Sequence, residues 1–336
     1  MLSYFIRRLL LAALVVWGAT TMMFLLFIAT PGSATDFLAG GEKAVSQDVQ
    51  ENFKKAYGLD KSLPAQYLTY WKNFSHWDLG KSLKNNRPVN ELLKTRAANS
   101  ARLAFWGLTI EVVVGISIGV LAAVRRYSWA DYITGFLAVA VTGIPVFVMG
   151  LLLQFSFGVL PGPNRFDWPR WARFPVQGLG PNNWFGVIPL GHQWKFLILP
   201  AFTLACVQTG FITRITRTSL LEVLGADYMR TARAKGLRKR TVIFKHGLRN
   251  ALIPVITVIG TDIISLFGVA VLTETVFNWP GLGSTIRDYA FTQDVPVVMG
   301  LGFAVVVAAA MLALAVDIGY AMLDPRIKLS TEKAAA

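Results

Sequence analysis

Four acidic residues lie in or beside long apolar stretches of this sequence, and they are the first candidates for chemistry: Glu111, Asp262, Glu274 and Asp317. Ionisable groups in such stretches normally face a protein interior or a water-filled path, where they bind or relay charge. We therefore predict that Glu111, Asp262 and Glu274 line a polar path. Asp262 is equally consistent with a paired structural carboxylate, and Asp317, near the end of its stretch, is better interpreted as structural.

Two glutamines and three helix-disrupting residues occur in the same apolar stretches. Gln154 and Gln208 could supply polar partners near the middle of the stretches, so both join the candidate path. Gly143 with Pro145, and separately Gly260, interrupt apolar runs. Broken helices often line polar paths because their freed backbone groups need polar company, but packing kinks are the commoner explanation.

Two enzyme-like motifs fail on their context. The run 115–119, Gly-Ile-Ser-Ile-Gly, has the spacing of a nucleophile elbow, but it lies inside an apolar stretch and favours close helix packing instead. The three histidines, His76, His192 and His246, fall outside the apolar stretches, so no base is at hand for a serine there. We therefore expect a non-catalytic protein, with a multi-pass membrane enzyme kept as an alternative.

The motif Gly80-Lys81-Ser82 is similar to the end of a phosphate-binding loop, but Ser75 stands where the first glycine should be. We therefore expect that the chain itself binds no ATP. Cys206 is the one cysteine of the sequence, which excludes an internal disulfide and a multi-cysteine metal site.

Composition explains where these residues must sit. The 336 residues are 54% hydrophobic and 15% charged, with a net charge of +14, and the mean hydropathy is +0.49. Such a chain is too apolar for an ordinary soluble domain and is typical of a bilayer protein. The basic residues adjoin apolar runs and form no known nucleic-acid-binding module, so nucleic acid is not an expected partner.

Six segments are long and apolar enough to cross a bilayer, and their patterns favour helices over barrel strands. They are residues 9–29, 101–124, 131–160, 196–213, 251–272 and 295–320. The first resembles a signal peptide but spans a full bilayer, so we interpret residues 1–29 as a retained anchor helix. The sequence thus predicts an all-α polytopic membrane protein with a transmembrane core over residues 101–322.

Basic residues in the short connections set the predicted orientation. Arg125 and Arg126 mark one connection, and ten Lys or Arg residues lie between residues 214 and 249 against two acidic ones. By the positive-inside rule both connections, and with them both termini and the tail 323–336, are expected to be cytoplasmic. Residues 30–100 then form an extracytoplasmic cap, expected to contain short helices, and residues 161–195 a second outer loop.

The loop over residues 214–250 contains the most informative motif. Its members are Asp227, Tyr228, Met229, Arg230, Thr231, Ala232, Arg233, Ala234, Lys235 and Gly236. The motif predicts a short helix with Asp227 as its N-cap and Gly236 as its left-handed stop. Two turns are marginal in water, which favours a helix ordered by a partner. The alternative is that the charges only set topology.

Motifs along nearly the whole chain resemble the permeases of binding-protein-dependent ABC importers, in the dipeptide and oligopeptide branch. They are Gly58-Leu59-Asp60, Asp78-Leu79-Gly80, the loop text from Tyr228 to Leu237, Leu248-Arg249-Asn250-Ala251, Thr273-Glu274-Thr275-Val276-Phe277, Trp279-Pro280-Gly281-Leu282-Gly283, and Asp324-Pro325-Arg326-Ile327. In the loop, Arg230 and Thr231 replace the glutamate and first alanine of the family's general pattern, while Ala232 and Gly236 remain.

The resemblance implies a type I importer permease in the bacterial inner membrane. The loop helix would couple it to two ATP-binding subunits, which hold ATP and Mg, and this chain would need no cofactor. A homologous second permease, an extracytoplasmic solute-binding protein and a peptide substrate would complete the system. Nickel complexes, glutathione and haem remain open as substrates, and an ion-coupled secondary transporter that uses Asp262 or Glu111 remains an alternative.

Overall fold

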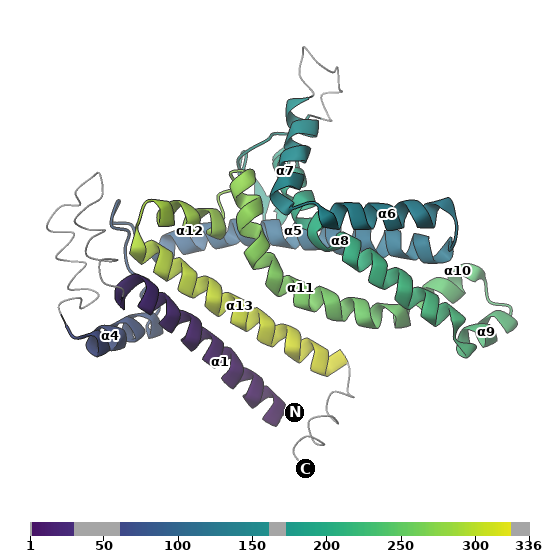
Figure 1. Ribbon diagram of the computed structural model, residues 1–336, viewed down its shortest axis with the longest axis horizontal. Helices are drawn as coiled ribbons and strands as arrows, with labels where there is room; N and C mark the ends of the chain where they lie inside the picture. The colour runs from purple at the N-terminus through teal and green to yellow at the C-terminus, as the bar shows by residue number, and fades with distance from the viewer. Residues whose placement is uncertain (1, 30–60, 161–172, 324–336) are drawn as a thin grey trace. The chain divides into compact units, whose positions relative to one another are not determined.

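The computed structural model describes residues 2–29, 61–160 and 173–323, and these ranges are largely helical (Figure 1). The helices run between polar connections, as the apolar pattern predicts. Three predicted features lie outside the described residues: the motif at 58–60, the first part of the cap (30–60), and the tail with its motif at 324–327. The described part of the cap contains α4 (Leu63–Ser75), which confirms a short helix there.

Five of the described helices are long and apolar enough to cross a bilayer, and a bent pair of helices gives a sixth if the two together form one span. The five are α1 (Leu2–Phe24, continued by η1, Leu25–Ala29), α5 (Val89–Val124), α8 (Gln193–Gly225), α11 (Arg249–Val276) and α13 (Val295–Leu323). The bent pair is α6 (Trp129–Gly143) with α7 (Val146–Gln154), which η2 (Phe155–Val159) extends. The prediction of an all-α protein with about six spans is confirmed.

The interruption expected at Gly143 and Pro145 is present, and the one expected equally at Gly260 is not. The axis turns by 105° between α6 and the segment from Val146. Pro145 has no N–H to continue the ladder and disfavours helical backbone in the residue before it, so the turn falls here. In contrast, α11 is continuous through Gly260. A single glycine destabilises a helix by only about 1 kcal/mol relative to alanine, which is too little to interrupt a helix of this length.

Several helices extend beyond the apolar runs that predicted them. The helix α5 begins at Val89 rather than at residue 101, and α8 ends at Gly225 rather than at residue 213. Hydropathy reports only the lipid-immersed part of a helix, whereas backbone hydrogen bonding continues into the aqueous part.

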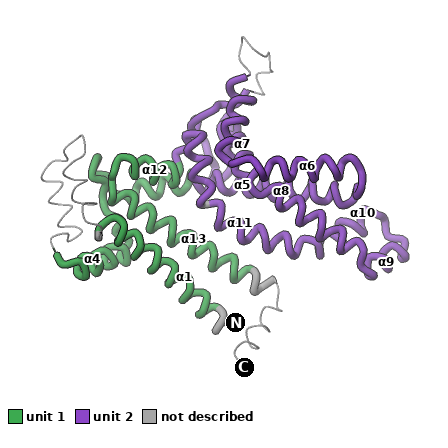
Figure 2. The backbone as a smooth tube through the Cα atoms, viewed as in Figure 1, with its two compact units in different colours: residues 1–99, 281–336 green, residues 100–280 purple. Residues whose placement is uncertain are grey.

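The chain forms two compact units, residues 1–99 with 281–336, and residues 100–280 (Figure 2). In the first unit α1 packs along α13, and an apolar core of aromatic and aliphatic side chains joins them to α4 and to α12 (Leu282–Phe291). Arg8 and Asp317 form an ion pair between α1 and α13, with 2.8 Å between Nη1 and Oδ2. Asp317 therefore has the structural role that its position suggested.

The loop around Gly80-Lys81-Ser82 also belongs to the first unit, and it is organised by Asp294. The buried Asp294 carboxylate accepts hydrogen bonds from the Ser82 hydroxyl at 2.6 Å and the Leu83 amide at 3.2 Å. These bonds tie the loop to the segment between α12 and α13. The Ser82 hydroxyl of the apparent phosphate motif is thus already hydrogen-bonded to a carboxylate.

In the second unit α8 is the central helix, and α6, α7 and α11 pack against it. Leu204 and Trp279 are fully buried in its apolar core. A short antiparallel pair of strands, β1 (Trp184–Phe185) and β2 (Ile188–Pro189), precedes α8. The connection from α8 to α11 contains α9 (Asp227–Ala234), α10 (Lys239–Thr241) and η4 (Val242–Leu248).

Candidate functional site

The predicted loop helix exists as α9, at the far end of α8 in the second unit (Figure 1). Its inner face packs into a small apolar cluster, in which Met229 is fully buried beside Ala232 and Val242. Its ends are also fixed. The Arg233 guanidinium donates to the Leu224 carbonyl at 3.0 Å, and the Asn250 amide donates to the Tyr228 hydroxyl at 2.9 Å. A displacement of α9 would therefore be transmitted to both α8 and α11.

The termini of α9 differ from the prediction at one end and agree at the other. Ala226, in extended backbone, is the N-cap residue, and Asp227 is the first helical residue without a capping hydrogen bond. The N-cap prediction was wrong by one residue; as a first-turn acid, Asp227 still interacts favourably with the helix dipole. Gly236 has a φ of +74°, which confirms it as the left-handed stop.

The outer face of α9 is exposed along its whole length. Exposed positions include Asp227, Tyr228, Arg230, Thr231, Arg233, Ala234 and Lys235. Three basic side chains against one acid give this face a positive charge, and Tyr228 adds an aromatic ring that is 44% exposed. A face that is basic and aromatic, on a helix anchored from behind, is suited to contact another protein.

The polar residues inside the spans are positioned by a close crossing of α5 and α8. A Cβ atom added to a glycine of α5 would lie 2.6–2.8 Å from an α8 side chain at three places. The contacts join Gly107 to Leu204, Gly115 to Ile212, and Gly119 to Thr216. The small-residue packing predicted for the 115–119 motif is thus confirmed. Each of these three side-chain contacts joins residues 97 positions apart, so α5 and α8 run in parallel with one register.

Glu111 occupies the one position of this series that is not glycine, and the same register places Gln208 opposite it on α8. The Glu111 side chain is fully buried. Its carboxyl lies close enough to that of Asp262, on α11, for the two to interact electrostatically. The Asp262 Oδ1 atom accepts a hydrogen bond from the Ser265 hydroxyl at 2.8 Å. Three predicted residues are thus brought to one region of the bundle.

The other two predicted path residues lie elsewhere on the second unit. Glu274 is twelve residues after Asp262 on the continuous α11, or about 18 Å along its axis. Its Oε1 atom accepts a hydrogen bond from the Ser100 hydroxyl at 2.5 Å. Gln154 donates to the carbonyls of Val176 and Val276, at 2.6 and 2.9 Å. Both side chains brace the end of α11, and a role for them in a path stays a prediction.

One ion pair of the second unit was not predicted from the sequence. The Arg217 guanidinium on α8 donates two hydrogen bonds, of 2.6 and 2.8 Å, to the Asp131 carboxylate on α6. The Asp131 Oδ2 atom also accepts from the Tyr127 amide at 3.0 Å. Sequence reasoning assigned Asp131 to a span boundary and Arg217 to a basic run, and nothing in the sequence pairs residues so far apart.

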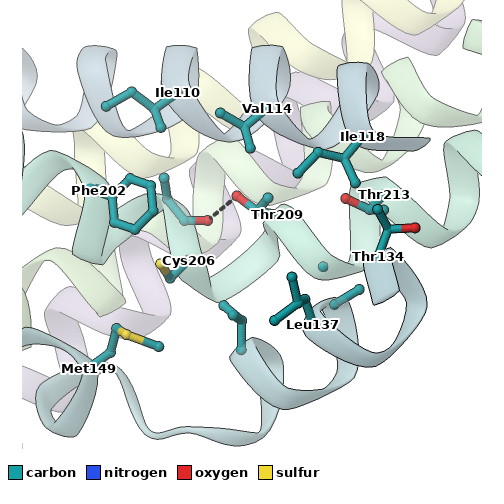
Figure 3. Close-up of a pocket in the computed structure, with 14 residues that line it drawn as sticks. Ile110, Val114, Ile118, Thr134, Leu137, Met149, Phe202, Cys206, Thr209 and Thr213 are labelled. Atoms are coloured by element: carbon teal, nitrogen blue, oxygen red, sulfur yellow. Dashed lines mark hydrogen bonds between the residues drawn. The ribbon is translucent and has the colours of Figure 1, made fainter. Parts of the chain in front are cut away.

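An apolar cavity of about 270 Å³ lies between α5, α6, α7 and α8 (Figure 3). Ile110, Val114 and Ile118 point into it from α5, and Cys206 and Phe202 line it from α8. Glu111, Asp262 and Gln208 are not among its lining residues. None of the described residues that line the cavity carries a charge at neutral pH, and its polar side chains are threonines.

Two family models match this chain. The binding-protein-dependent transport system inner membrane component model matches residues 115–329, and the corresponding N-terminal model matches residues 1–104. The chain belongs to this family. The match includes the whole connection that carries α9, and it agrees with the all-helical, multi-spanning fold.

Relatives of known name agree with the family assignment over nearly their full lengths. The chain is 38% identical over 330 residues to the oligopeptide transport system permease protein AppB of Bacillus subtilis, with 98% of this chain and all of that protein covered. It is 36% identical over 347 residues to the dipeptide transport system permease protein DppB of Escherichia coli K12, covering 98% and 99% of the two chains. A dipeptide permease of Alkalihalophilus pseudofirmus is 36% identical over 335 residues.

Proposed function

We propose that this chain is a permease subunit of an ATP-driven importer of dipeptides or oligopeptides. The observation that carries the proposal is α9: a basic, exposed helix that lies between two spans and is anchored to both. Family membership and the names of the relatives support the class of transport and of cargo.

In this proposal α9 is a coupling helix. ATP-binding subunits on the cytoplasmic side bind the outer face of α9 and move it as they close around ATP and Mg. Because Met229 and Ala232 are packed inside and Arg233 and Asn250 hold the flanking helices, the motion passes to α8 and α11. The spans then change between inward-facing and outward-facing arrangements.

The remaining parts of the system follow from the same proposal. A homologous second permease pairs with this chain in the inner membrane, and a solute-binding protein delivers peptide from outside. Both termini are cytoplasmic, as the basic connections indicate. This subunit performs no catalysis of its own, and Glu111, Asp262 and Gln208 contribute polar groups to the path through which the cargo moves.

The coupling role is tested with charge reversal on the outer face of α9. In the double variant Arg230→Glu and Lys235→Glu, which leaves the Arg233 anchor intact, we expect the ATP-binding subunits to co-purify at least about ten-fold less. A basic face is suited to an acidic partner surface, and like charges at an interface cost several kcal/mol. The matched control is Lys84→Glu with Arg87→Glu, two exposed basic residues of the predicted outer loop. Unchanged co-purification of the α9 variant would refute the docking role.

Uptake into membrane vesicles separates this function from an ion-coupled secondary transporter. We expect the reconstituted system to take up a labelled dipeptide only when ATP is present. Uptake by this chain alone, driven by a pH gradient without ATP, would contradict the proposal and favour the secondary transporter.

A further inference from the structure

The Glu111 and Asp262 carboxyls form a pair whose hydrogen bonding is incomplete within the described residues. Glu111 is 0% and Asp262 3% exposed. Neither oxygen of Glu111 has a hydrogen-bond partner there, and neither has the Oδ2 atom of Asp262. Buried polar atoms in native proteins are nearly always partnered, so three unpartnered oxygens in one place indicate a missing donor.

No charged group of the described residues neutralises this pair. Asp262 is the one charged residue found to interact with Glu111. The other titratable or charged side chains of the three helices in this unit are Arg102 on α5, Lys195, Cys206, Arg214, Arg217 and Glu222 on α8, and Arg249 and Glu274 on α11.

Several of these groups are already engaged elsewhere. Arg217 is bound to Asp131, Glu274 accepts from Ser100, and Arg102 stacks on Trp184. An apolar core cluster of this unit lies nearby in the chain, because its members Leu204 and Leu266 are four residues from Gln208 and Asp262 on α8 and α11. Two ionised carboxylates there would repel each other, and both charges would be withheld from water.

We propose that Glu111 and Asp262 form a proton-binding site in the sealed bundle, with one proton held between the two carboxyls. A proton on one carboxyl converts an acceptor oxygen into a donor for the other carboxyl, which lies close enough to interact with it. One proton thereby gives one oxygen of each carboxyl a hydrogen-bond partner and leaves the pair with a single negative charge. The Ser265 hydroxyl stabilises that charge by donating to the Asp262 Oδ1 atom.

The site links proton binding to the conformation of the permease, and this consequence rests on the proposed transport function. When the helices separate and water reaches the pair, ionisation of both carboxyls is no longer costly, and the proton is released. The sealed state therefore binds the proton more tightly than the opened state. Low pH favours the sealed state, and rising pH favours the opened state.

Infrared spectroscopy of the full chain with its partner subunits in lipid vesicles tests the site. Exposed carboxyls titrate near pH 4, so at pH 7 the stretch of a protonated carboxylic acid reports only buried groups. We expect such a band in the wild type at pH 7, shifted in heavy water, and lost in Glu111→Gln. In Asp262→Asn we expect it to disappear or move in frequency. Asp317→Asn, which removes an ion-paired carboxylate, is the matched control and leaves the band unchanged.

The outcomes are separable from those of the transport proposal, because the band is measured without ATP or cargo. An absent band in the wild type, or the same band in Glu111→Gln, overturns the proton site even if coupling through α9 is correct. A band that follows Glu111 upholds the site even if the α9 variants bind ATPase normally.

Discussion

Substitution of Gly210 by alanine gives the sharpest test of how α6 and α8 are packed. A Cβ atom at Gly210 would lie 2.3 Å from the Ala138 carbonyl oxygen and 2.7 Å from the Thr142 Cγ2 atom. Ordinary contact starts at 3.4 Å. The oxygen belongs to the backbone and cannot rotate away, so α6 must withdraw by a distance on the order of 1 Å.

The expected loss of stability follows from two opposing effects. Overpacking of a close-packed contact costs typically about 1–3 kcal/mol, and a backbone clash falls at the upper end. Alanine is a better helix former than glycine by about 1 kcal/mol, which offsets part of this. We therefore expect Gly210→Ala to lower the free energy of unfolding by about 2 kcal/mol, measured by denaturant titration of the purified permease in mixed micelles.

Gly135→Ala is the matched control on the facing helix. A Cβ atom at Gly135 meets nothing within 4 Å, so this variant gains helix propensity without a clash and is expected to be neutral or stabilised by up to about 1 kcal/mol. If both variants unfold at the same denaturant concentration, the close approach of α6 and α8 is wrong.

Three further predictions address other parts of the molecule. Asp131→Ala leaves Arg217 without its bidentate partner. We expect it to lower the free energy of unfolding by about 3 kcal/mol in the same titration, which is the low end for a broken buried ion pair because Arg217 is partly exposed. Equal stability of Asp131→Ala and wild type would refute the structural role of the pair. Gly236→Pro forces φ to about −65° where the structure has +74°, so ATP-driven uptake should be lost while membrane insertion persists; normal uptake would contradict the stop after α9. Asp294→Ala removes the acceptor of the loop that contains Ser82 and should make this loop sensitive to limited proteolysis in intact membranes, which an unchanged digestion pattern would disprove.

The sequence was sufficient for features that depend on local chemistry. Apolar runs predicted the spans, because crossing a bilayer demands an uninterrupted apolar helix. Pro145 predicted the break before α7, because a missing N–H acts at its own position. Gly236 predicted the end of α9, because a positive φ favours glycine wherever it occurs.

Features that depend on contacts between helices distant in the sequence could not be predicted from local sequence patterns. The pairing of Asp131 with Arg217 requires the antiparallel placement of α6 on α8, which no local pattern encodes. Gly260 was considered as a break because glycine weakens helices, but the tertiary packing of α11 overrides that weak preference. The register that places Gln208 opposite Glu111 became visible only through the glycine contacts between α5 and α8.

The most direct test of the coupling role is site-specific cross-linking from α9. The one native cysteine, Cys206, is buried, so a Cys206→Ser background allows a single cysteine at the exposed position of Arg230 to carry a short cross-linker. In membranes that contain the whole transporter, we predict an adduct with an ATP-binding subunit whose yield changes when ATP is added. The absence of any such adduct from Arg230 and from Tyr228, in a transporter that still takes up peptide, would contradict the account.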